Sequence, residues 1–276
     1  MPKHSFGGTW TAEKLNILSS YLSAYLVALK NQSFNKIYID AFAGTGKIAV
    51  GDAEEEIEGS VRLALNSENK FDKYIFIEKK KSFAQELQFI VDTEYSEFRD
   101  KVSVENKDCN AALIEICANT NWITNRAILF LDPYATELKW DTLKAVADTK
   151  AIDVWYLFPF SAAQRMMKND GKIDESWKLK LNSLLGDEGW FDRFYTPDPQ
   201  IDMFSDGNMI KNVNTQALSN YITERLGTLF PAVAKNPRLL FNTKNSPLFL
   251  FCFAVANDNP KASGLALKIA DHILKG

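Results

Sequence analysis

The chain is poor in the residues that build metal centres and charge-relay catalysts. Its 276 residues include two histidines, His4 and His272, and three cysteines, Cys109, Cys117 and Cys252. The cysteines are widely spaced and form no CxxC pair, whereas zinc sites and disulfide scaffolds need closely spaced ligands or paired thiols. We therefore expect no metal site, no histidine-based hydrolase, and a reducing, cytoplasmic environment.

Long hydrophobic runs and an excess of one charge are also missing. The longest strongly apolar run, residues 247–256, is far shorter than the ~20 residues that cross a bilayer. The first ten residues lack the apolar core of a signal peptide, so we expect no membrane association. Lys and Arg number 32 against 35 Asp and Glu. That balance excludes a general basic field for nucleic acid but allows a local basic face.

The remaining composition is that of a large globular domain. Hydrophobic residues make up 46% and charged residues 24%, as in ordinary soluble proteins. The length suits a single domain over residues 1–276. Short apolar runs alternate with amphipathic segments, which predicts an α/β fold with a parallel sheet between helices. The expected strands are 36–41, 73–78, 102–106, 127–132 and 152–158, and the expected helices are 11–30, 60–66, 80–98, 110–118 and 140–149.

The alternation breaks after the fifth expected strand. Residues 160–235 look helical and aromatic, which predicts a helical insert or subdomain. Two apolar runs follow, 238–242 and 248–255, and the linker between them is too short for a parallel crossover. They should form an antiparallel hairpin, covered by a helix over 261–274. Seven strands, with five parallel crossovers and a terminal antiparallel hairpin, match the Rossmann-like sheet of class I methyltransferases.

A glycine-rich turn, Ala-Gly-Thr-Gly, follows the first expected strand, and glycines let a backbone approach a ligand closely. Ala41 and Ile48 break the pattern of a Walker A loop. A dinucleotide fingerprint can be drawn through Gly44, Gly46 and Ala49. However, five acids then follow between residues 52 and 58, an unfavourable setting for a pyrophosphate.

The same turn also fits methyltransferase motif I, Asp-x-Phe-x-Gly-x-Gly, through Asp40, Phe42, Gly44 and Gly46. In that motif the turn holds the methionine part of S-adenosylmethionine (SAM), which carries no phosphate. Asp40 suits the cationic sulfonium and ammonium groups of SAM. A strand-to-helix turn that binds nothing is the alternative, since glycine is common in such turns.

Three more charged residues are candidates for holding SAM. Glu78 closes the second strand, where it can accept the ribose hydroxyls or remain a solvated charge. Asp108 follows the third strand, where it can accept the adenine amino group and also cap the next helix. Lys14 can pair with the methionine carboxylate if the segment from Trp10 folds over the pocket. A capping segment with a packed tryptophan is the alternative.

The fourth strand ends in Asp132-Pro133-Tyr134, the candidate catalytic residues. This tripeptide resembles the Asp-Pro-Pro-Tyr motif of amino-group methyltransferases, with one proline missing. Asp132 and nearby carbonyls can accept hydrogen bonds from an amine, and Tyr134 can stack on a base. A strand stop with a turn is the alternative. All these signals fall at the carboxyl ends of successive strands, in methyltransferase order, and this agreement favours the methyltransferase interpretation.

A basic cluster with two nearby tryptophans, Trp177 and Trp190, lies in the expected insert. A groove for nucleic acid would combine phosphate contacts with base stacking. Intervening acids favour the other interpretation, a solvated helix face over buried aromatics. The cluster comprises Arg165, Lys168, Lys172, Lys178 and Lys180.

Several stretches in the first half of the chain resemble the bacterial three-Cys-motif partner (TcmP) family. They are Trp10-Thr-Ala-Glu-Lys-Leu15 with Tyr21-Leu-Ser-Ala-Tyr25, Tyr38-Ile-Asp-Ala-Phe-Ala-Gly-Thr-Gly46, Gly59-Ser60 with Ala64-Leu65, and Phe130-Leu-Asp-Pro-Tyr134. The resemblance implies a methyltransferase-like fold and SAM as cofactor. It also implies a partner protein with three clustered cysteines, of iron–sulfur or radical-SAM type. The three cysteines of this chain are not that motif.

These observations leave three functional hypotheses. The first is a SAM-dependent methyltransferase acting on an amino group of a nucleic-acid base. Such a reaction needs positioning more than acid–base groups, which suits the scarcity of histidine. The second is a non-catalytic methyltransferase-fold partner of the three-Cys protein. The third, a dinucleotide oxidoreductase, is disfavoured by the acidic loop and the terminal hairpin.

Overall fold

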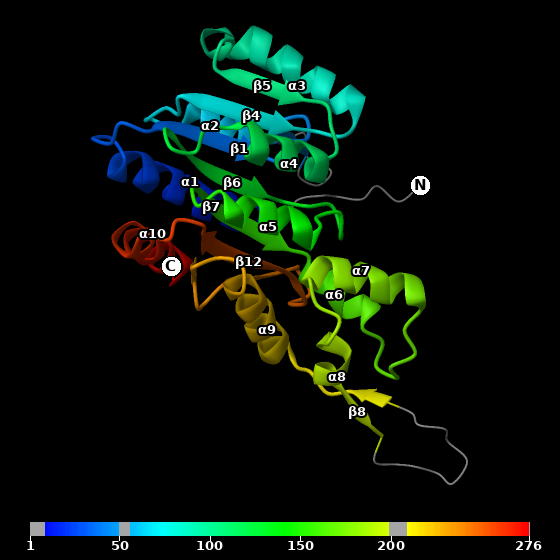
Figure 1. Ribbon diagram of the computed structural model, residues 1–276. Helices are drawn as coiled ribbons and strands as arrows, with labels where there is room; N and C mark the ends of the chain where they lie inside the picture. Colours follow the sequence, from blue (N-terminus) through cyan, green and yellow to red (C-terminus); the bar gives the residue numbers. More distant parts are fainter. Residues whose placement is uncertain (1–8, 50–55, 199–208, 276) are drawn as a thin grey trace.

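The computed structural model describes residues 9–49, 56–198 and 209–275. At its centre is an eight-stranded sheet in the order β10-β12-β7-β6-β1-β4-β5, with β11 also paired to β12 (Figure 1). The strands are β1 (Asn35–Asp40), β4 (Lys73–Ile77), β5 (Val102–Glu105), β6 (Asn125–Leu131), β7 (Ile152–Phe158), β10 (Ala232–Val233), β11 (Arg238–Phe241) and β12 (Pro247–Val255).

Strand directions confirm the expected topology. β1, β4, β5, β6 and β7 run parallel, and β12 runs antiparallel to both β7 and β11. Strand β11 is therefore parallel to β7, and five crossovers connect the parallel strands in chain order. The terminal pair β11–β12 is the expected antiparallel hairpin. Within the described part of this central sheet, the short β10, which pairs with the end of β12, is the one strand beyond the seven that the sequence predicts.

Alternating side chains divide the core into two layers, one on each face of the sheet. In β1, Ile37 and Ile39 pack into one layer and Tyr38 into the other. The first layer is covered by α4 (Cys109–Asn119), α5 (Trp140–Asp148) and the insert. The second is covered by α1 (Thr9–Ala28), α2 (Ser60–Asn66), α3 (Lys81–Glu94) and α10 (Pro260–Lys275). Each helix lies within four residues of its expected bounds, and a 3₁₀ turn, η1 (Ser96–Phe98), follows α3.

The insert between β7 and β11 is only partly helical, which corrects the sequence-based expectation. Its helices are α6 (Phe160–Met166), α7 (Glu175–Leu185), α8 (Trp190–Phe194) and α9 (Thr215–Gly227). Between α8 and α9, β8 (Tyr195–Pro197) pairs antiparallel with β9 (Met209–Lys211). Pro197 cannot continue a helix, which is consistent with the change to an extended structure after α8. Figure 1 shows α6, α7 and α8 beyond the end of β7, away from β1 and β4.

The acidic segment after the glycine turn is flanked by a small hairpin of β2 (Lys47–Ala49) and β3 (Glu56–Glu58). Asp52, Glu54 and Glu55 lie outside the described residues. The Gly59 amide donates to the Gly46 carbonyl over 3.2 Å, so the segment begins and ends beside the glycine turn. Across the described ranges, no helix has the length and apolarity needed to cross a membrane.

Candidate functional site

A cavity of about 510 Å³ opens at the carboxyl ends of β1, β4 and β6. Ligands of doubly wound sheets bind at this edge, and the volume falls in the range of about 300–1,000 Å³ typical of small-molecule sites. The described residues that line it are Ala41, Phe42, Gly44, Ile77, Glu78, Lys79, Lys80, Phe83, Cys109, Asp132, Tyr134 and Glu137.

Half of the site residues expected from the sequence belong to this lining, namely Phe42, Gly44, Glu78, Asp132 and Tyr134. The other half are neighbours or partners of lining residues. Asp40, Gly46, Asp108 and Pro133 lie within two positions of one along the chain, and Lys14 bonds to Asp132. The structure therefore brings five of the predicted residues into the cavity lining and places the other five next to lining residues.

The two glycines of the turn, Gly44 and Gly46, have different structural roles. Both adopt left-handed backbone conformations, with φ of +59° at Gly44 and +75° at Gly46, which favour glycine. A Cβ atom at Gly44 would meet nothing within 4 Å, because this glycine faces the open cavity. A Cβ atom at Gly46 would lie 3.3 Å from the Leu87 side chain of α3. Gly44 leaves room in the cavity, whereas Gly46 allows close packing.

Asp40 is buried behind this turn and does not line the cavity. Its carboxylate accepts hydrogen bonds from the Phe42 amide, over 3.2 Å, and from the Ser60 hydroxyl, over 2.5 Å. Burial raises the pKa of Asp40 to about 6, and these two donors limit the rise. The sequence suggested a contact with the cationic ligand. In the structure, the carboxylate instead ties the turn after β1 to the start of α2.

Glu78 joins the ends of β4 and β1. One carboxylate oxygen accepts from the Gly44 amide over 3.0 Å, and the other accepts from the Lys80 amide over 2.7 Å. A carboxylate oxygen can accept more than one hydrogen bond. Glu78 therefore fixes the glycine turn and still has capacity for hydroxyl donors in the cavity.

Asp108 caps α4, as the sequence-based alternative described. Its side chain accepts from the Asn110 amide over 3.0 Å and pairs with Lys79 over 3.2 Å. Partial burial tends to raise the pKa of Asp108, but the bonds from Asn110 and Lys79 outweigh it and leave this pKa below its usual value. The carboxylate stays ionised beside Cys109, which does line the cavity.

The end of β6 meets the first helix through an ion pair between Lys14 and Asp132. The Lys14 side chain is 6% exposed and lies 4.9 Å from the centre of the Trp10 ring. The Asp132 side chain is 25% exposed and faces the cavity. The sequence assigned Lys14 to the methionine carboxylate and Asp132 to an acceptor amine, but it did not show that the two side chains bond each other. Tyr134, 73% exposed, stands at the rim.

Sequence reasoning missed several residues of the lining. Phe83 reaches it from α3, and the Lys80 ammonium lies 3.7 Å from the centre of its ring. From the sequence, a phenylalanine in an amphipathic helix is expected to belong to the hydrophobic core. The partial exposure of Phe83 in the structure shows that it faces the cavity instead. Burial raises the pKa of Cys109 to about 12, so this cysteine remains a thiol and not a nucleophile at neutral pH.

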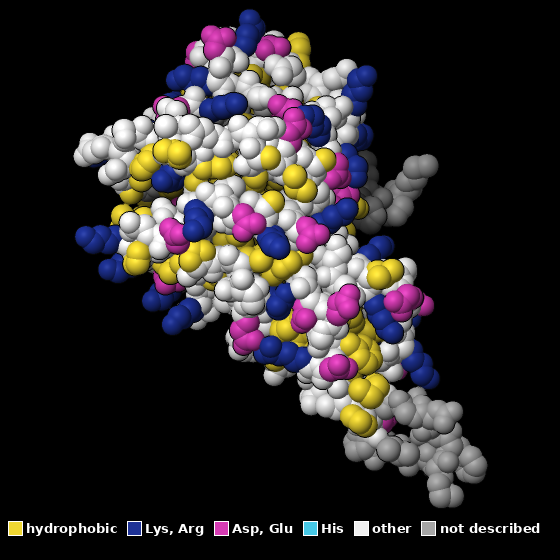
Figure 2. Space-filling model, viewed as in Figure 1, with side chains coloured by type: hydrophobic (Ala, Val, Ile, Leu, Met, Phe, Trp, Pro, Cys, Tyr) yellow, Lys and Arg dark blue, Asp and Glu magenta, His cyan; other side chains and the backbone are white. Residues whose placement is uncertain are grey.

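Two of the five members of the basic cluster in the insert form ion pairs with nearby acids. Lys168 pairs with Asp174 over 3.0 Å and Lys178 with Glu175 over 3.8 Å. Trp190 is buried, with its indole nitrogen bonded to a neighbouring amide, so it offers no stacking face. Basic and acidic side chains are intermixed over the face shown in Figure 2. These observations favour the solvated helix face. Among the side chains described, no group of three or more His, Cys, Asp or Glu is placed to hold a metal.

The sheet order, the terminal hairpin and the position of the cavity define a class I methyltransferase-like fold. No family model matches the chain, and no curated protein sequence matches it. A Legionella pneumophila protein assigned to the family model DUF519 is similar over 97% of this chain and 93% of its own, with 12% identity and a TM-score of 0.50. This likeness concerns the fold alone.

Two further solved structures are similar to this chain at lower TM-scores. Spermidine synthase from Thermotoga maritima has 11% identity and a TM-score of 0.43, over 91% of this chain and 61% of its own. The methyltransferase domain of bacterial CtHen1-C has 10% identity and a TM-score of 0.41, over 87% of this chain and 98% of its own.

Proposed function

We propose that the protein binds SAM in the carboxyl-edge cavity and transfers its methyl group to an amino group of a nucleic-acid base. The observation that carries this proposal is the convergence of Phe42, Gly44, Glu78, Asp132 and Tyr134 on one cavity of about 510 Å³. Bound SAM would supply a methyl group already activated by the sulfonium. The chain would then have to position reactants rather than exchange protons with them.

Two observations support a fit to SAM. The open space in front of Gly44 leaves room for the methionine part beside the turn. Glu78 presents a carboxylate that would accept the ribose hydroxyls. Asp108, at the start of α4, would accept the adenine amino group. Asp40 would act indirectly, because its bonds to Phe42 and Ser60 hold the shape of the turn.

The end of β6 would orient the methyl acceptor. Asp132 and the carbonyl at Pro133 would accept the hydrogens of the amine, and Tyr134 would stack on a flat base with its exposed ring. Lys14 fixes the Asp132 carboxylate through their ion pair, and it would also be available to the methionine carboxylate. The acceptor would then be held next to the methyl group by β6 while β1 and β4 hold the cofactor.

The same ion pair supports a second proposal. A carboxylate that is bonded to a buried lysine is a weaker acceptor for a substrate amine, since the lysine already satisfies part of its charge. Together with the resemblance to the TcmP family, this supports a non-catalytic methyltransferase-fold protein. It would dock on an iron–sulfur or radical-SAM-like three-Cys protein.

Calorimetry with SAM and S-adenosylhomocysteine on the full chain tests the cofactor assignment. Gly44→Val should abolish binding, because its side chain would occupy the cavity. Glu78→Ala should weaken binding by about 1–3 kcal/mol through the loss of a charged acceptor. Glu115→Gln is the matched control, because Glu115 lies on α4 outside the cavity and pairs with Lys107. If the unaltered protein binds neither compound, the proposed function is wrong.

Labelled SAM incubated with total RNA, DNA and protein tests the transfer. Asp132→Ala should reduce turnover at least ~10²-fold, as the loss of an orienting contact can, while the affinity for SAM changes much less. Tight SAM binding without transfer to any of the three pools would favour the partner-protein alternative.

A further inference from the structure

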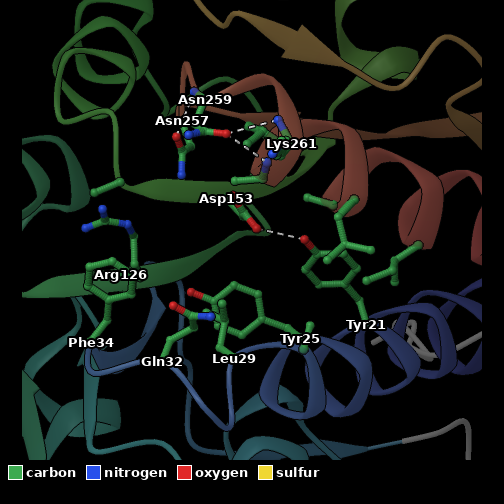
Figure 3. Close-up of a pocket in the computed structure, with 17 residues that line it drawn as sticks. Tyr21, Tyr25, Leu29, Gln32, Phe34, Arg126, Asp153, Asn257, Asn259 and Lys261 are labelled. Carbon is green, nitrogen blue, oxygen red and sulfur yellow. Dashed lines mark hydrogen bonds between the residues drawn. The ribbon is translucent and has the colours of Figure 1, made fainter.

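A second cavity, of about 480 Å³, opens at the opposite, amino-terminal edge of the parallel strands (Figure 3). Its walls are the end of α1, with Tyr21 and Tyr25, and the start of α10. The sheet contributes Arg126 of β6, Asp153 of β7 and Val255 of β12. This cavity shares no lining residue with the proposed SAM site, so methyl transfer leaves it unexplained.

Asp153 is an unusual residue for this position, the second residue of a core strand. The Tyr21 hydroxyl donates to its Oδ2 atom over 2.8 Å, as the dashed line in Figure 3 shows. No described residue donates to its other oxygen, Oδ1. Burial raises the pKa of Asp153 to about 7, against the opposing effects of the Tyr21 bond and the Arg126 charge. The carboxylate is therefore short of partners.

Arg126 lies beside Asp153 without forming an ion pair. Ile128 is paired with Asp153 in the ladder, so Arg126, two residues earlier, points to the same face. Its guanidinium lies 4.0 Å from the centre of the Phe34 ring. Its Nη1 group donates to the carbonyls of Trp122 and Asn125, over 2.6 and 2.7 Å. The Nη2 and Nε groups bond no residue in the described ranges.

We infer that this cavity binds a small molecule with a protonated amine next to a carboxylate, that is, an amino acid or a close analogue with an apolar side chain. The amine would meet the free oxygen of Asp153, and the carboxylate would meet the free donors of Arg126. The apolar side chain would pack on the hydrophobic wall formed by Leu29, Leu265 and Ile269. The volume of about 480 Å³ is adequate for such a molecule.

Other ligand classes fit this pair of groups less well. A phosphate would face the Asp153 carboxylate at close range, and like charges repel. A simple cation would leave Arg126 without a partner. A purely apolar molecule would remove both charges from water without compensation, which is costly. An ionised amine and carboxylate on one small molecule satisfy both groups together. This inference does not depend on the proposed methyl transfer.

Calorimetry on the full chain with L-phenylalanine, L-leucine and L-methionine tests the ligand class. Phenethylamine and 3-phenylpropanoate are matched probes, because each keeps the phenyl body of phenylalanine and lacks one of its two charges. We expect at least one amino acid to bind, and each matched probe to bind at least ~10-fold more weakly than phenylalanine if phenylalanine is that ligand. No heat from any amino acid up to ~10 mM would overturn the inference, as would equal binding of phenethylamine.

Variants test the location. Asp153→Asn keeps the size of the side chain and an oxygen for the Tyr21 hydroxyl, and should weaken binding of the amino acid at least ~10-fold. Arg126→Lys keeps the charge but loses the forked donor geometry, and should act in the same direction. Unchanged affinity in both variants would overturn the inference.

A third variant covers the case in which the charge changes disturb folding. Ala266→Leu on α10 adds bulk to the cavity wall and leaves both charged residues unchanged, so it should abolish binding while circular dichroism stays native. Lys268→Leu is its control, because Lys268 is exposed on the same helix and does not line the cavity. Unchanged binding in Ala266→Leu would overturn the inference. SAM binding, measured in parallel, should remain unchanged in Ala266→Leu, which separates this test from that of the proposed function.

Discussion

The ion pair between Lys14 and Asp132 gives a prediction about stability as well as function. Asp132→Asn removes the negative charge and leaves the Lys14 ammonium buried at 6% exposure. Its remaining neighbours are the Trp10 ring at 4.9 Å and the charge of Asp40. Lys14→Met removes the cation instead and leaves two carboxylates close together. Each single change should therefore destabilise the fold.

The magnitude follows from the burial of the two partners. Breaking a fully buried pair costs about 3–5 kcal/mol, because one charge remains uncompensated. Here Asp132 is 25% exposed, so water stabilises it in part, and a tryptophan face stabilises a lysine by about 0.5–1 kcal/mol. We expect Asp132→Asn to cost about 2–3 kcal/mol and Lys14→Met about 1–2 kcal/mol. The double variant should cost no more than the larger single change, which corresponds to a coupling energy of about 1–2 kcal/mol.

Urea unfolding followed by circular dichroism measures all four proteins of this cycle. The coupling energy should remain about 1–2 kcal/mol in 1 M salt, because salt screens a buried ion pair poorly. Single changes that add to the double change within about 0.5 kcal/mol would refute the reasoning, since they would show independent sites. The same data supply the folded fraction that any turnover measurement on Asp132 variants must take into account.

Three further predictions concern other parts of the fold. Gly186→Ala should destabilise the protein by about 3 kcal/mol or more, because the new Cβ would lie 2.0 Å from the Trp140 side chain and the backbone φ is +61°. The loss should appear as a lower melting temperature. Gly227→Ala is the control, because a Cβ at Gly227 would meet nothing within 4 Å. The pKa of Asp153, raised from 3.8 to about 7, means that the folded state binds the proton more tightly, so stability should fall as pH rises through this interval. Urea unfolding at pH 4 to 8 measures how the free energy of unfolding changes with pH, and Asp153→Asn should make this decrease smaller. A larger decrease in Asp153→Asn than in the unaltered protein would contradict the raised pKa of Asp153. Ser60→Ala, which removes a donor to the buried carboxylate of β1, should cost about 1–2 kcal/mol in unfolding and reduce SAM affinity in calorimetry.

Much of the fold follows from local patterns in the sequence. The five parallel strands are short apolar runs, and burial on both faces of the sheet explains their nearly continuous hydrophobicity. The terminal hairpin follows from the linker over residues 243–247, because so short a connection allows only antiparallel pairing. The β8–β9 pair was missed, since two three-residue strands carry no periodicity. The end of α3 was also placed too late, because the chain turns at Tyr95, where φ is −129°.

The sequence predicts the residues of the candidate site that lie at strand ends better than those that lie on helices. Gly44, Glu78 and Asp132 meet at one edge because parallel strands bring their carboxyl ends together. The partner of Asp132 lies 118 positions away on α1, and no spacing in the sequence indicates that contact. Phe83 was missed for a related reason, because a side chain on a helix is assigned to the core or the surface only when its neighbours are known.

The two cavities differ in how far the protein itself satisfies their charged groups. At the carboxyl edge, both oxygens of Glu78 bond backbone amides and Asp132 bonds Lys14. These acids are held in place before any ligand arrives, which suits a reaction that depends on alignment. At the amino edge, Asp153 and Arg126 each retain unused bonding atoms that face the open cavity, where a ligand can meet them. A positioning function therefore fits the first cavity, and an unassigned ligand fits the second.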